Sequence, residues 1–89
     1  MNRIFLVAAE SSGDALGADL IRELKARDPK LELPGVGGDA MADAGVKSAV
    51  DISGLAVLGF IEGIKAYGRV KEAVKETVAA ILAAKPDVV

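Results

Sequence analysis

The sequence lacks cysteine, histidine and tryptophan, and these absences exclude whole classes of protein. Without cysteine there is no disulfide framework, and without cysteine or histidine there is no conventional zinc site. Aromatic residues make up only 3% of the chain, whereas 52% of its residues are hydrophobic. Many of these are Ala and Val, which bury little area each, so we expect a thin core.

A surplus of charge of one sign is also missing. The chain has 11 Lys and Arg against 13 Asp and Glu, a net charge of −2. It therefore lacks the excess of positive charge that nucleic-acid-binding proteins carry. No apolar run approaches the roughly 20 residues needed to span a bilayer. Acids follow the first apolar run at once, unlike in a signal peptide, so we expect a cytoplasmic protein. Its 89 residues suffice for one small domain at most.

The first half of the chain alternates strand and helix patterns. The apolar run at residues 3–9 predicts a strand covered on both faces. A helix follows and ends at Asp28–Pro29, and one of its faces holds Leu16, Leu20, Ile21 and Leu24. Residues 30–38 predict a second strand that runs into glycines. Pro34 within that strand favours an edge position or a short strand.

The alternation continues to the last residue. Residues 39–45 predict a short helix with Asp39 as N-cap and Gly45 as its stop. A short strand at 46–52 and a helix near 59–66 come next. The longest helix spans 69–85, with an apolar face of Val70, Val74, Val78, Ile81 and Leu82, and a strand begins at 87–89. This order predicts an α/β fold, a partial Rossmann-like parallel sheet with flanking helices, in a single truncated domain over residues 1–89.

Two loops follow strands at the carboxyl edge of this sheet, where α/β proteins bind ligands. The first loop reads "ESSGD" and contains Glu10, Ser11, Ser12, Gly13 and Asp14. Its serines and glycine precede a helix N-terminus, which favours an anion, and Glu10 is a candidate general base or acceptor for sugar hydroxyls. A purely structural interpretation stays open, because Ser12 or Asp14 can simply cap the helix.

The second loop, "GVGGDAM", contains Gly37, Gly38 and Met41 and is a weak signal when taken alone. It lacks the third glycine of a dinucleotide fingerprint, and the chain has no Gly-Lys-Ser/Thr phosphate loop. The later segment "LAVLGFIEGI" is apolar, and both a core and a surface location remain open for it.

Four stretches, "IFLVAAESSGDALGADLIRELKARDP", "GVGGDAMADAG", "LAVLGFIEGI" and "KPDVV", occur in the order found at the start of lipid-A-disaccharide synthases, which the chain resembles over essentially its whole length. The resemblance implies a two-domain GT-B glycosyltransferase that needs no metal or other cofactor. Such an enzyme transfers an acylated glucosaminyl unit from a UDP donor to an acylated glucosamine 1-phosphate at the bacterial inner membrane, and releases UDP.

The resemblance also implies roles for individual residues. Glu10 becomes a candidate catalytic residue, and the candidate substrate-binding residues are Ser11, Ser12, Gly13, Asp14, Gly37, Gly38 and Met41. The candidate lipid-facing residues are Leu58, Phe60, Ile61 and Ile64. Ala9 stands where the family usually has glycine, and Asp39 and Ala40 replace its Pro-Arg pair.

The resemblance places one further catalytic group outside the chain. The family's catalytic aspartate is expected just beyond Val89, the last residue of "KPDVV". The donor-binding domain is expected later still. We therefore expect the 89 residues alone to be inactive.

Two alternatives belong to other functional classes. One is an inactive α/β module that forms a homo-oligomer through an exposed sheet edge. The other is a small phosphate-binding half-domain, for which anions are expected to raise the melting temperature.

Overall fold

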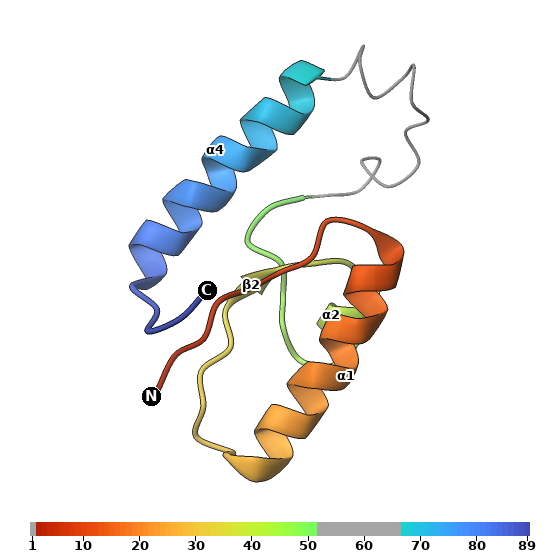
Figure 1. The fold of residues 1–89 in the computed structure, drawn as a ribbon, viewed down its shortest axis with the longest axis vertical. Coiled ribbons are helices and arrows are strands. Elements are labelled where there is room, and N and C mark those ends of the chain that lie inside the picture. The colour runs from red at the N-terminus through yellow and green to blue at the C-terminus, as the bar shows by residue number, and fades with distance from the viewer. Residues whose placement is uncertain (1, 52–66) are drawn as a thin grey trace.

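The computed structural model describes residues 2–51 and 67–89, and it contains two strands and three helices within them. Strands β1 (Leu6–Val7) and β2 (Gly35–Val36) pair in parallel. Helix α1 (Ser11–Arg27) connects them, the short helix α2 (Asp39–Asp43) follows β2, and α4 (Tyr67–Ala84) is the longest helix (Figure 1). Over these residues the alternation of strands and helices is as the sequence predicts, and the predicted helix near 59–66 lies outside the described residues.

Single bridges extend this pair to four parallel segments. Gly35 of β2 is bridged to Ser48, which lies in the predicted third strand, and Ile4 beside β1 is bridged to Val88 in the last one. The spatial order is thus third, second, first, fourth, which is the order of the first four strands of a doubly wound Rossmann sheet. The predicted fold class, a partial Rossmann-like parallel sheet with flanking helices, is confirmed.

The edge position suggested by Pro34 is wrong, whereas the short strand is right. β2 lies between β1 and the segment of Ser48, so it is internal to the sheet. Proline lacks only the N–H group, and the carbonyl of Pro34 still accepts a hydrogen bond of 3.1 Å from the amide of Leu6. The proline therefore limits the length of the strand without moving it to an edge.

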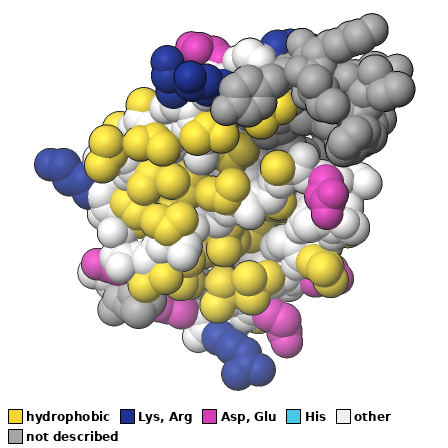
Figure 2. All heavy atoms as spheres, turned by 45° about the horizontal axis from the view of Figure 1, so that its top comes forward, with side chains coloured by type: hydrophobic (Ala, Val, Ile, Leu, Met, Phe, Trp, Pro, Cys, Tyr) yellow, Lys and Arg dark blue, Asp and Glu magenta, His cyan; other side chains and the backbone are white. Residues whose placement is uncertain are grey.

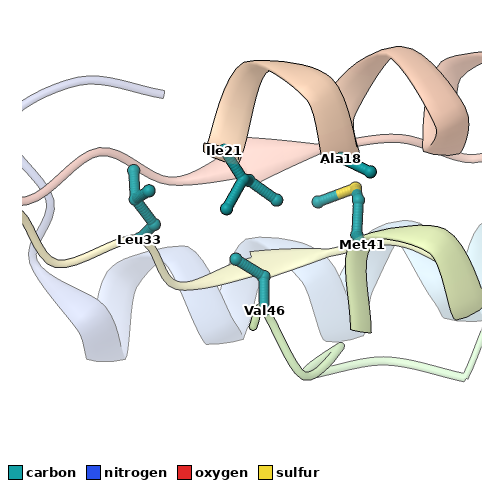
Figure 3. Packing of buried hydrophobic residues seen from close by; sticks show 5 residues of the cluster. All are labelled: Ala18, Ile21, Leu33, Met41 and Val46. Atoms are coloured by element: carbon teal, nitrogen blue, oxygen red, sulfur yellow. The ribbon is translucent and has the colours of Figure 1, made fainter. Parts of the chain in front are cut away.

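Helices cover both faces of the sheet, with α1 and α2 on one side and α4 on the other (Figure 1). Figure 3 shows the first core, in which side chains from α1, α2 and the strand segments meet: Ala18, Ile21, Leu33, Met41 and Val46. The second core lies under α4 and contains Phe5, Val36 and Val50, with Ala73, Ala80, Ile81 and Ala84 packed against them.

The predicted core faces of the two long helices are only partly right. In α1, Ile21 is completely buried, but Leu16 remains 71% exposed. In α4, only Ile81 of the predicted face packs against the buried core, and the remaining four residues are exposed: Val70, Val74, Val78 and Leu82. The alanines of α4 face the sheet instead, because small side chains let a helix approach a sheet closely.

The two ends of the described chain lie side by side (Figure 1). The carboxylate of Asp87 accepts hydrogen bonds of 2.9 Å from the backbone amides of Asn2 and Arg3. These two donors hold the pKa of Asp87 below its ordinary value. The guanidinium of Arg3 also pairs with Glu32 at 2.7 Å and donates to the carbonyl of Ala84. The start of the first strand is thereby tied to the fourth.

Gly35 allows β1 and β2 to approach closely, and its replacement by alanine is expected to destabilise the fold. A Cβ atom at Gly35 would lie 2.5 Å from the carbonyl oxygen of Leu6, which is fixed in the sheet. We expect Gly35→Ala to lower the free energy of unfolding by about 1–3 kcal/mol, as overpacking does, in urea denaturation.

Gly68→Ala is the matched control, since a Cβ atom at this position of α4 meets nothing within 4 Å. It should leave the free energy of unfolding unchanged or raise it by up to about 1 kcal/mol. Equal stability of the two variants would contradict the tight approach at Gly35.

Candidate functional site

The tip of β1 presents a carboxylate and two hydroxyls to solvent. Glu10 is the N-cap residue of α1, and Glu10, Ser11 and Ser12 are all exposed. The hydroxyl of Ser12 donates a 3.2 Å hydrogen bond to Oε1 of Glu10, and no side chain caps the helix. The first bond of the helix runs from the amide of Asp14 to the carbonyl of Glu10, at 2.9 Å, so the earlier amides lie ahead of the helical ladder.

Asp14 points away from this tip and caps another helix. It is 8% exposed, and its carboxylate accepts hydrogen bonds from the backbone amides of Gly38 (2.8 Å), Ala40 (2.9 Å) and Met41 (3.0 Å). These amides form the N-terminus of α2, where a negative charge is also favoured by the helix dipole. Asp14 is therefore the cap of α2, supplied from α1, and neither Asp14 nor Ser12 caps α1 itself.

The three donors set the protonation state of Asp14. Burial raises the pKa of its carboxyl, but the hydrogen bonds from Met41, Gly38 and Ala40 together outweigh burial. The pKa therefore lies below the ordinary value, and Asp14 is ionised at neutral pH. A proton-transfer role near neutral pH does not fit this group.

The second loop is joined to the first through Asp14. The predicted N-cap of α2, Asp39, is instead its first residue, and Gly38 precedes it. A Cβ atom at Gly38 would lie 2.7 Å from Oδ2 of Asp14, so only glycine permits this capping contact. Gly45 ends the segment with φ of +108°, as predicted for a stop signal. The two loops therefore meet, as expected of neighbouring strand ends.

The other predicted residues of the second loop face inward. Met41 has no exposed surface, and the buried Gly37 donates its amide to the hydroxyl of Ser48 at 3.1 Å. Ser48, which sequence reasoning missed, in turn donates to the carbonyl of Val50 at 2.5 Å. The available signal was a serine placed between the buried residues Val46 and Val50 of the predicted third strand. The contacts that the structure gives Met41 and Gly37 are thus structural, and their predicted role in substrate binding stays a prediction.

Ala9, the departure from the family's glycine, causes no backbone strain. Among the described residues, the only non-glycine residue with positive φ is Lys85, so Ala9 does not need the conformational freedom of glycine. Asp39 stands in the first turn of α2, where an acid favours the helix. The candidate lipid-facing residues Leu58, Phe60, Ile61 and Ile64 lie outside the described residues.

Val89 is the last residue of the sequence, and the resemblance implies a catalytic aspartate just beyond it. Its own aliphatic side chain is 66% exposed and has no group able to transfer a proton or to bind a phosphate, so Val89 is not a catalytic residue. It follows Val88, which is bridged to Ile4 beside β1. The expected aspartate is not among the 89 residues, and its role stays a prediction.

The exposed tip lies next to the topological switch point of the sheet. β1 has β2 on one side and the segment of Val88 on the other, and the order of strands reverses between these two neighbours. Ligands of doubly wound sheets bind in the crevice outside the carboxyl ends of the strands at such a point. Glu10, Ser11 and Ser12 are the exposed residues that the described part of the chain places at this point. Gly13, the next residue, is half-buried.

Two features are absent from residues 2–51 and 67–89. They contain no group of three or more His, Cys, Asp or Glu side chains able to hold a metal ion. None of the helices described is both long enough and apolar enough to cross a membrane.

Comparisons with known proteins agree with the resemblance seen in the sequence. A family model described as lipid-A-disaccharide synthetase matches residues 4–89. The chain belongs to this family. Lipid-A-disaccharide synthases of Pseudomonas fluorescens, Xanthomonas euvesicatoria and Ruegeria pomeroyi are 45%, 44% and 38% identical to it, each over 97% of the chain. The chain spans only 20–23% of the length of these synthases. No solved structure matches it.

Proposed function

We propose that the chain forms the acceptor-side wall of a glycosyltransferase of lipid A biosynthesis. The proposed reaction joins UDP-2,3-diacylglucosamine to 2,3-diacylglucosamine 1-phosphate, forms the lipid A disaccharide and releases UDP. Family membership supports the reaction class. The observation that carries the site is the exposed Glu10, Ser11 and Ser12 at the tip of β1, beside the switch point of the sheet.

The proposed roles follow from the chemistry of these groups. Glu10 orients or polarises a sugar hydroxyl, since an exposed carboxylate accepts hydrogen bonds from hydroxyl groups. Ser11, Ser12 and the first amides of α1 face the phosphate or the sugar, because the N-terminus of a helix favours an anion. Asp14 and Gly38 hold this wall in place through the cap of α2.

The location and partners of the longer protein belong to the same proposal. Substrates with acyl chains reside in a membrane, so we place the enzyme on the cytoplasmic side of the inner membrane, bound peripherally. Self-association through the exposed sheet edge remains the proposed form of any homo-oligomer.

A transfer assay on two proteins tests the proposed function. The first is the 89-residue chain, and the second is a chimaera in which it replaces the matched segment of the Pseudomonas fluorescens synthase, 45% identical to it. With UDP-diacylglucosamine and diacylglucosamine 1-phosphate, the chimaera is expected to release UDP and the chain alone is not.

Both results have a physical reason. The chain is expected to supply only the acceptor wall, and the rest of the synthase, about four-fifths of its length, supplies the donor site. The native synthase serves as the activity control. A soluble, folded chimaera without turnover would contradict the proposal, as would transfer by the 89-residue chain alone.

A further inference from the structure

The two ends of the sheet present different surfaces. Figure 2, in which the top of Figure 1 comes forward, shows hydrophobic side chains gathered on one face, with charged side chains around them. The amino ends of the strands, at the other end of the sheet, border a hollow of about 510 Å³. Volumes of roughly 300–1,000 Å³ are typical of small-molecule sites. This hollow is separate from the candidate site, which lies at the carboxyl ends of the strands.

Segments that are distant in the sequence enclose the hollow. Arg3 lies at the start of the first strand, Lys25 in the last turn of α1, and Gly45 just after α2. Residues 31–34, which lead into β2, contribute two leucines and a proline, and Ala84 ends α4. The hollow therefore combines aliphatic surface with two cationic side chains.

The ammonium group of Lys25 has no counter-ion in the hollow. No hydrogen bond or ion pair with another described residue engages it. The side chain is half-buried, and its Nζ atom lies against the turn at Gly45, where a Cβ atom would be 2.8 Å from it. A lysine withdrawn from water is normally paired. The charge of Lys25 is therefore free to bind an anion.

The charge of Arg3 is already balanced, but its guanidinium retains donors. Its Nε and Nη2 atoms contact Oε2 of Glu32 at 2.7 Å, and Nη1 donates to the carbonyl of Ala84. A guanidinium has five N–H groups, so these three contacts leave two of them for a further acceptor. The lining carries two positive charges, on Arg3 and Lys25, against one negative charge on Glu32. One negative charge on a ligand balances it.

We propose that this hollow binds a small aliphatic monocarboxylate. The carboxylate accepts hydrogen bonds from Lys25 and from the remaining donors of Arg3, and the aliphatic body lies against Leu31, Leu33 and Pro34. A monocarboxylate carries the single charge that balances the lining, whereas a phosphate ester carries about −1.5 to −2 at pH 7. The proposed site does not depend on the proposed function, because it involves neither the tip of β1 nor sugar transfer.

An NMR titration of the 89-residue chain with sodium hexanoate tests the proposal. At constant ionic strength, the amide signals of Leu33 and Gly45 are expected to shift and to saturate by about 10 mM hexanoate. The signal of Ser12, at the other end of the sheet, should not move. Lys25→Met removes the charge but keeps an aliphatic side chain. We expect it to weaken binding by about tenfold or more, as the loss of a hydrogen bond to a charged group does.

Two further variants complete the test, each checked for a cooperative melt. Lys25→Arg keeps the cation and should retain binding. Lys71→Met is the matched control, since it removes the same charge from an exposed position of α4 and should bind hexanoate as the wild type does.

Four results would overturn the proposal. They are shifts that do not saturate, equal affinity of Lys25→Met and Lys71→Met, equally tight binding of uncharged hexanol, and equally tight binding of inorganic phosphate at the same signals. The first two would remove the site or the role of Lys25, and the last two would remove the carboxylate or the aliphatic body from its recognition. None of these measurements requires transfer activity, so they stand or fall separately from the proposed function.

Discussion

Replacing Asp14 by alanine is expected to abolish the cooperative thermal unfolding of the chain at neutral pH. The carboxylate satisfies three backbone amides at the start of α2, and one of them, the amide of Met41, lies in the buried core. Alanine leaves all three donors without this acceptor, and unsatisfied buried donors are strongly destabilising. Because α2 carries Met41 into the first core, loss of the cap also loosens that core.

Asp14→Asn removes the charge and only part of the capping contacts. One accepting oxygen remains, but an NH2 group replaces the other oxygen and cannot accept from the backbone amide that it faces, so we expect the melting temperature to fall by about 5–10 °C. Asp43→Asn is the control, since this exposed residue at the end of α2 should tolerate the same change. Circular dichroism melts measure both effects. A cooperative Asp14→Ala melt at the wild-type temperature would contradict the capping role.

The lowered pKa of Asp14 fixes the sign of the pH dependence. Its folded-state pKa lies below the unfolded one, so its contribution is complete above the ordinary pKa of about 4 and is lost as pH falls through the folded pKa. Wild-type stability should therefore decline more steeply than that of Asp14→Asn in acid. Asp87, whose pKa is also lowered, adds a separate part of this decline that the variant retains.

The sequence predicted the elements well because their signals are local. The apolar run of β1, the proline after α1, and Gly45 after α2 each act within a few residues of the feature that they determine. Parallel pairing followed from the alternation of strands and helices. The strand order was not predicted in detail, since it depends on which segments pair at a distance.

The face of α4 was mispredicted because hydrophobicity alone ranks valine above alanine. The sheet instead accepts Ala73, Ala80 and Ala84, whose small side chains let the helix lie close, and leaves Val74 exposed. The choice between these faces depends on what else packs on the helix.

The location of the candidate site was predicted, but the sequence did not show that Asp14 caps α2 while Glu10, Ser11 and Ser12 are exposed. Both loops were expected at the carboxyl edge, and they meet there. The capping of α2 by Asp14 bridges 24 residues of sequence, so no local rule indicates it. One signal was available: Asp14, Ala18 and Ile21 share a face of α1, so a single acid falls in the buried stripe. Such an acid needs buried donors, and the amides of the second loop provide them.

The second large effect is expected at Glu10, and it concerns turnover rather than stability. In the chimaera, Glu10→Gln keeps the shape and the hydrogen-bonding oxygen of the side chain but removes its charge and basicity. We expect the rate of transfer to fall by about 100-fold, the lower range for loss of a general acid–base group. Glu10 is exposed and no side chain caps α1, so the melting temperature should not change. Glu23→Gln, the same change at an exposed position of α1, should retain full activity.

The single-turnover rate of the Glu10→Gln chimaera, measured as UDP released from saturating substrates, tests most directly whether the tip of β1 is the working surface of this chain. The account predicts a rate about 100-fold below that of the unmodified chimaera, with an unchanged melting temperature. A rate within about twofold of the unmodified chimaera, in a folded protein, would remove Glu10 from the mechanism and contradict the account.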